Sequence, residues 1–87
     1  MAPAVASARP ANARPVKHSL TLQGHRTSVS LEAAFWRAFR EIAVARSQTL
    51  NGLAAEIDTA RGDVGLASAI RVFVLEHLQT QIALTRH

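Results

Sequence analysis

The chain of 87 residues contains no cysteine. That absence excludes disulfide bonds, thiolate metal sites and a cysteine nucleophile. The four histidines are at positions 18, 25, 77 and 87, and no two of them have the spacing of a zinc site. We therefore expect no metal and no cofactor. A domain of this size has a marginal core and commonly depends on disulfides, metals or oligomerisation. The sequence thus favours an oligomer.

Long hydrophobic runs are also missing. The longest apolar stretch, IRVFVLEHL, is too short to cross a bilayer. The N-terminal segment lacks the hydrophobic core of a secretory signal peptide. We expect a soluble, cytoplasmic protein with no membrane partner. Apolar residues nevertheless make up 48% of the chain, which is much for one small domain to hide and again favours an oligomer.

Acidic residues are few, six against ten basic residues, which gives a net charge of +4. A basic excess in a small domain is compatible with a polyanionic partner such as nucleic acid. Residues 1–16 are rich in alanine, proline and arginine and show no apolar periodicity. We expect this segment to be a disordered basic arm, followed by a single domain over residues 17–87.

Two stretches alternate between polar and apolar residues and are predicted to be strands, residues 17–23 and 26–31. Gln23 and Gly24 could form the tight turn of a hairpin between them. Alternatively, residues 18–31 form one extended ribbon with a kink at Gly24. A six-residue strand cannot form a sheet alone, so its partner is either the other stretch or a second copy of the chain.

Three helices are predicted over residues 32–46, 50–61 and 66–82 from apolar residues at helical spacing. Thr49 is suited to cap the second helix, and Gly62 is suited to end it. In the third helix, Val72 and Leu75 widen the apolar surface beyond one stripe. This favours burial on two sides, as at a subunit interface.

The order of strand, helix, short turn and helix in RTSVSLEAAFWRAFREIAVARSQTLNGLAAEI resembles ribbon-helix-helix DNA-binding domains of the MetJ/Arc type. The resemblance covers residues 25–61, and the GHRTSVSLE segment and third helix are similar to a small bacterial subfamily. It implies a mostly α fold with a short β-ribbon, in an intertwined homodimer whose two strands pair antiparallel between subunits. The chain departs from the family pattern at Ser47, where a turn glycine is common, and at Gly52 in the second helix.

The resemblance also implies functional residues. A two-stranded ribbon fits the DNA major groove, and the alternate strand residues that would touch bases are Arg26, Ser28 and Ser30. The start of the second helix would offer N–H groups to a phosphate at Thr49, Leu50 and Asn51. His25, beside Arg26, is a further candidate for a phosphate contact. The predicted dimer core consists of Val29, Leu31, Phe35, Trp36, Phe39, Ile42, Leu53, Ile57, Ile70 and Phe73. The alternative for the strand residues is an ordinary solvent-facing strand.

No serine lies in a nucleophile setting and no glycine-rich phosphate loop is present, so we do not expect an enzyme. The leading hypothesis is a dimeric, sequence-specific regulator of transcription, a repressor, with double-stranded DNA and a second copy as partners. The alternative is an interaction or antitoxin-type dimer that uses the fold mainly to bind a protein. The helical C-terminus favours the regulator, because antitoxin tails are usually disordered. A small-ligand sensor, with a cavity between the second and third helices, is a third hypothesis.

Overall fold

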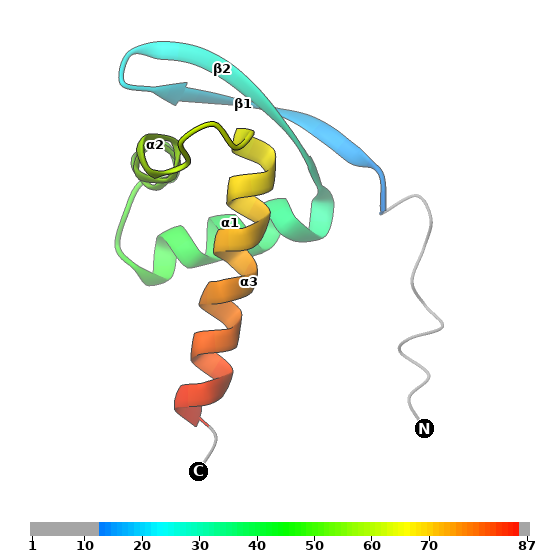
Figure 1. The fold of residues 1–87 in the computed structure, drawn as a ribbon, viewed down its shortest axis with the longest axis vertical. Helices are drawn as coiled ribbons and strands as arrows, with labels where there is room; N and C mark the ends of the chain where they lie inside the picture. Colours follow the sequence, from blue (N-terminus) through cyan, green and yellow to red (C-terminus); the bar gives the residue numbers. More distant parts are fainter. Residues whose placement is uncertain (1–12, 86–87) are drawn as a thin grey trace.

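The structure is a computed structural model that describes residues 13–85 (Figure 1). Its elements are β1 (Pro15–Leu22), β2 (His25–Glu32), α1 (Ala33–Ala45), α2 (Leu50–Ala60) and α3 (Leu66–Thr85). The two strands form an antiparallel hairpin that lies above α2 and the start of α3, and α3 runs away from it (Figure 1). Two strands followed by three helices confirm the predicted order. The predicted arm lies mostly outside the described residues, and β1 begins two residues before the predicted strand.

The hairpin decides between the two arrangements that the sequence left open. Gln23 and Gly24 both have positive φ, 52° and 85°, as a type I′ turn requires. Glycine adopts this conformation freely, whereas glutamine does so with strain. The register pairs Leu22 with His25 next to the turn and Pro15 with Glu32 at the open end. β2 therefore has a partner strand within its own chain, and its other edge is left for any further strand.

A single chain builds its own hydrophobic core between the hairpin and the helices. The inner face of the hairpin contributes Leu20, Val29 and Leu31 to this core. The three helices contribute the other buried residues, which are Phe39, Ile42, Ala43, Leu53, Ala54, Ile57, Ile70 and Val74. The core residues follow the alternation of the strands and the helical spacing of the helices, as the sequence pattern predicts.

Local backbone chemistry fixes the connection from α1 to α2. The N–H of Gln48 donates to Ala43 O at 2.9 Å and that of Ser47 donates to Val44 O at 3.0 Å. These two bonds form a Schellman motif, in which the residue after the cap adopts the left-handed conformation. Ser47 occupies that position with φ 56°. At Ser47 the chain therefore has a serine in a left-handed position that glycine adopts without strain, which is where it departs from the family pattern.

Both ends of α2 agree with the sequence prediction. The Thr49 side chain accepts from the N–H of Gly52 at 2.9 Å, which confirms Thr49 as the N-cap. Gly62, just after the helix, has φ 65° and ends it in the left-handed conformation. α2 thus has a fixed start, and that start lies close to the hairpin.

α3 is three residues longer than predicted, and it braces both the hairpin and α1. Its Arg71 binds Glu32 at the end of β2 and lies 5.9 Å from the centre of the Phe35 ring. Two residues further along α3, the ring centre of Phe73 lies 5.5 Å from the guanidinium of Arg46. No helix within residues 13–85 is both long enough and apolar enough to cross a membrane.

Candidate nucleic-acid interface

The outer face of the hairpin, which points away from the helices, carries two parallel rows of polar side chains. Residues paired across an antiparallel ladder lie on the same face of the sheet. The register places Arg26 opposite Thr21, Ser28 opposite Ser19, and Ser30 opposite Lys17. All six are exposed. The predicted base-contacting residues therefore lie together on one face, and a second row from β1 lies beside them.

The charge of this face is positive. Lys17 and Arg26 are its cations, and the hairpin contains one carboxylate, Glu32, at its open end. Arg71 donates to both oxygens of Glu32, at 2.9 Å and 3.2 Å. These hydrogen bonds hold the pKa of Glu32 below its ordinary value. The carboxylate is thus matched by a cation from α3, and the hairpin keeps its basic character.

The hydrogen bonds of the hairpin show which backbone groups point to its two free edges. The N–H of Thr21 donates to Asn51 Oδ1 at 3.1 Å, so it points away from β2. Arg71 Nη2 donates to Ser30 O at 3.4 Å, so this carbonyl points away from β1. Antiparallel ladders alternate between bonded and non-bonded pairs, so the non-bonded pairs include Ser19 and Ser28. The β2 residues with outer-face side chains therefore also direct their backbone groups to the free edge of β2.

The start of α2 lies beside the other strand, β1. The hydrogen bond from Thr21 to Asn51 joins the two elements. The Thr49 side chain is occupied by its cap to Gly52. The N–H groups of Leu50 and Asn51 find no acceptor among the described residues and are open to an anion. Of the predicted phosphate-contacting residues, these two thus offer free backbone donors, while His25 is exposed next to the turn.

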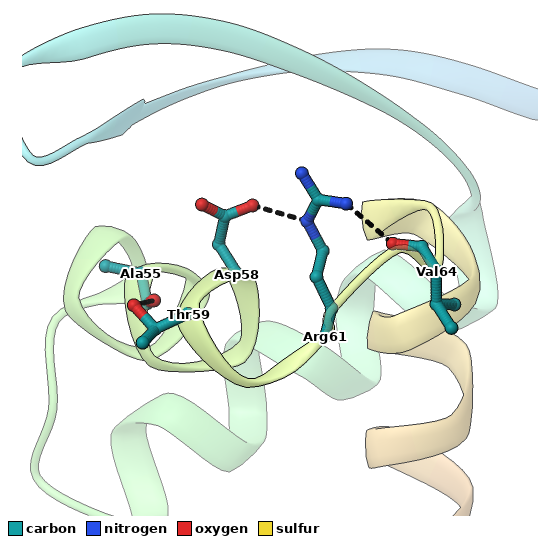
Figure 2. A network of polar contacts seen from close by, with 5 residues as sticks. All are labelled: Ala55, Asp58, Thr59, Arg61 and Val64. Atoms are coloured by element: carbon teal, nitrogen blue, oxygen red, sulfur yellow. Dashed lines mark hydrogen bonds and ion pairs between the residues drawn. The ribbon is translucent and has the colours of Figure 1, made fainter.

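A polar hollow of about 370 Å³ lies between the hairpin tip and the end of α2, and Arg61 is part of its lining. Arg61 donates from Nε to Asp58 Oδ1 at 2.6 Å and from Nη1 to Val64 O at 2.7 Å (Figure 2). The same region includes a bond from the Thr59 hydroxyl to Ala55 O at 3.0 Å (Figure 2). Arg61 therefore ties the end of α2 to the loop before α3, and its charge is matched by Asp58.

The residues predicted to form a dimer core lie in or next to the core of one chain. Those buried are Val29, Leu31, Phe39, Ile42, Leu53, Ile57 and Ile70, whereas Phe35, Trp36 and Phe73 are partly buried against it. Trp36 stacks on the ring of His18, with 4.0 Å between centroids and 5° between planes. This stack holds the inner face of β1 on α1.

Sequence reasoning missed Lys17, Ser19 and Thr21 as part of the candidate interface. Their alternation with Leu20 and Leu22 was the available signal, but without a fixed register it did not place them beside β2. The two-residue turn supplies that register. The outer face of one chain therefore consists of two strands, whereas the sequence named candidate residues on one strand only.

A sequence model of a protein family, described as a ribbon-helix-helix domain, matches residues 15–78 of the chain. The matched region starts at the first residue of β1 and ends within α3. No curated protein and no solved structure shows a significant match.

Proposed function

Because the chain belongs to the ribbon-helix-helix domain family, whose members are commonly DNA-binding regulators, we propose that it is a sequence-specific transcriptional repressor acting as a homodimer. The observation that carries the proposal is the outer face of the hairpin. It is basic and rich in hydroxyl groups, and every side chain on it between the turn and Glu32 is exposed. No apolar side chain interrupts the row on β2.

β2 reads the bases in this proposal. Each major-groove base edge presents a distinct pattern of donors and acceptors. The Arg26 guanidinium can bond to guanine O6 and N7 together, and the hydroxyls of Ser28 and Ser30 can donate or accept. Phosphate contacts come from the N–H groups of Leu50 and Asn51 at the start of α2. Such contacts fix the orientation of the protein, while the strand specifies the sequence.

The homodimer forms along the free edge of β2. The backbone groups of Arg26 and Ser28 point to this edge and have no partner among the described residues, so they are available to a second strand. Arg71 contacts this edge at Ser30 O, near its open end, whereas the edge of β1 is closed at Thr21 by Asn51. A second copy that pairs its own β2 antiparallel would satisfy both chains. This arrangement keeps the pairing between subunits that the family resemblance implies and adds β1 at each side.

The test of DNA binding is an anisotropy titration against pooled random-sequence duplexes at two salt concentrations, followed by sequencing of the bound fraction. We expect steeply salt-dependent binding and one enriched sequence. Arg26→Ala should relax the preference at one position, at a loss of about 1–3 kcal/mol. Arg40→Ala, an exposed arginine on α1, removes the same charge and should leave the preference unchanged. Identical preferences in wild type and Arg26→Ala would refute the assignment.

A second experiment tests the dimer through two matched proline variants. Ser28→Pro removes an N–H that points to the free edge of β2, and Ser19→Pro removes the equivalent N–H on β1. Neither change takes a donor from the ladder between β1 and β2. By sedimentation equilibrium, wild type and Ser19→Pro should be dimers and Ser28→Pro a monomer. The reverse pattern would place the subunit contact on β1.

One observation favours a protein-interaction function as the second candidate. α3 carries several apolar side chains outside the core, each between 45% and 54% exposed. These side chains are Val72, Leu75, Leu78 and Ile82. Exposed apolar patches commonly mark protein contacts. This candidate would be favoured over the repressor by a dimer that does not bind DNA but does bind a hydrophobic dye. The double variant with Leu75→Ser and Ile82→Ser should then lose dye binding.

A further inference from the structure

We infer that β1 forms the border of the DNA interface and that Lys17, Ser19 and Thr21 contact the sugar–phosphate backbone, while β2 lies in the groove. This inference rests on the proposed function and on pairing through β2. It assigns the second polar row, which belongs to neither the predicted base contacts nor the predicted phosphate contacts. It also divides the six outer-face side chains into two groups with different effects on binding.

The spacing of strands carries the first step. In a dimer paired through β2, the strand order is β1, β2, the partner's β2 and the partner's β1. Neighbouring strands lie about 4.8 Å apart, so the two β2 strands occupy the centre and the two β1 strands are about 14 Å apart. The major groove of B-form DNA is about 12 Å wide. The central pair fits within it, whereas the β1 strands reach the walls, where the phosphates are.

The chemistry of the β1 side chains carries the second step. Lys17 has a compact, flexible cation that suits a phosphate oxygen, whereas the fork of Arg26 suits two acceptors on one base. The hydroxyls of Ser19 and Thr21 can each donate one hydrogen bond to a phosphate. All three are exposed, and β1 contains no acidic residue to repel the backbone.

The third step is the position of α2. The bond from Thr21 to Asn51, at 3.1 Å, fixes the start of α2 beside the free edge of β1. The open N–H groups of Leu50 and Asn51 therefore lie on the β1 side of the hairpin. Side-chain donors from β1 and backbone donors from α2 then form one continuous row of donors. A single stretch of DNA backbone can follow that row.

The test compares Lys17→Ala with Arg26→Ala over a salt series on the enriched duplex and on its single-base variants. Losing one phosphate contact should weaken binding to all duplexes alike. The salt dependence should also become shallower, with the negative slope of log affinity against log salt reduced in magnitude by about one. Lys17→Arg should retain the slope. Ser19→Ala with Thr21→Ala should likewise weaken binding without changing the preferred sequence. Arg40→Ala controls for the general loss of one positive charge.

Three outcomes would overturn the inference, and they differ from one another. A changed base preference in Lys17→Ala would mean that β1 enters the groove. An unchanged salt slope in Lys17→Ala, or one equal to that of Arg40→Ala, would mean that β1 lies away from the DNA. If the wild-type dimer did not bind DNA, the proposed function would be refuted, and the role of β1 would be refuted with it. Because Lys17 is exposed, its variants should melt as the wild type does, which circular dichroism checks.

Discussion

Arg71 of α3 donates to both carboxylate oxygens of Glu32, which lies 39 positions earlier in the chain, at the end of β2. The same guanidinium reaches Ser30 O at 3.4 Å. One side chain from the last helix therefore fixes the point where the hairpin passes into α1. The orientation of the outer face relative to the helices depends on this junction.

The pair makes stability sensitive to acid. Hydrogen bonding to Arg71 lowers the pKa of Glu32 below its ordinary value of 4.5. A carboxyl group with a lowered folded-state pKa contributes stability above its unfolded value, and the contribution is lost as the pH falls through the folded value. Wild type should lose stability below about pH 4.5 more steeply than Glu32→Gln does in urea titrations. Glu41→Gln, which removes an exposed carboxyl of α1, should keep the wild-type slope, and equal slopes in all three proteins would contradict the linkage.

Ser47→Gly should stabilise the protein by about 0.5–1 kcal/mol, because the left-handed conformation is strained for serine and free for glycine. The Schellman bonds at this position need only the backbone, so the substitution keeps them. The measurement is the free energy of unfolding in urea. Ser47→Ala is the control, since it removes the hydroxyl and keeps the strain. A gain of equal size in the alanine variant would show that strain is not the cause.

Gly52→Ala should leave the free energy of unfolding almost unchanged, although replacing glycine by alanine inside a helix usually raises it by about 1 kcal/mol. A Cβ at this position would lie 2.8 Å from Thr49 Oγ1, which accepts the capping hydrogen bond. Displacing that hydroxyl would cost about as much as the cap contributes, about 1 kcal/mol. In a Thr49→Ala background, where the clashing hydroxyl is absent, Gly52→Ala should give the usual increase in stability. A double-mutant cycle measures the difference, and identical effects in both backgrounds would exclude the clash.

His18→Phe should stabilise the protein by about 1 kcal/mol, since a buried polar atom without a partner is destabilising. His18 Nε2 is buried and has no hydrogen-bond partner in the described part of the chain. Phenylalanine keeps an aromatic ring against Trp36 and removes the nitrogen. Thermal unfolding is the measurement, with His18→Ala as the control that loses both ring and nitrogen. A phenylalanine variant no more stable than wild type would indicate that the nitrogen is satisfied in solution.

Much of the fold could be predicted because its signals are local. The alternation in β2, the spacing in α1, Thr49 as a cap and Gly62 as a helix end each depend on a few neighbouring residues. The hairpin was undecided because Gln23 is not a residue that typically marks a type I′ turn, although it adopts one. Contacts between distant positions, such as Arg71 with Glu32, leave no trace in a single sequence. For the candidate site, the sequence named the outer-face residues of β2, whereas the register that places the β1 residues beside them came only from the structure. Contact of either row with DNA stays a prediction.

The two-residue turn also affects how the proposed dimers would exchange subunits with one another. Contacts between strands that are adjacent in sequence form early, since little chain entropy is lost in closing a short loop. In the proposed dimer, each chain would thus complete its hairpin before it meets another. Association through the edge of β2 would then join folded chains, and mixed dimers of wild-type and variant subunits would form without unfolding either one.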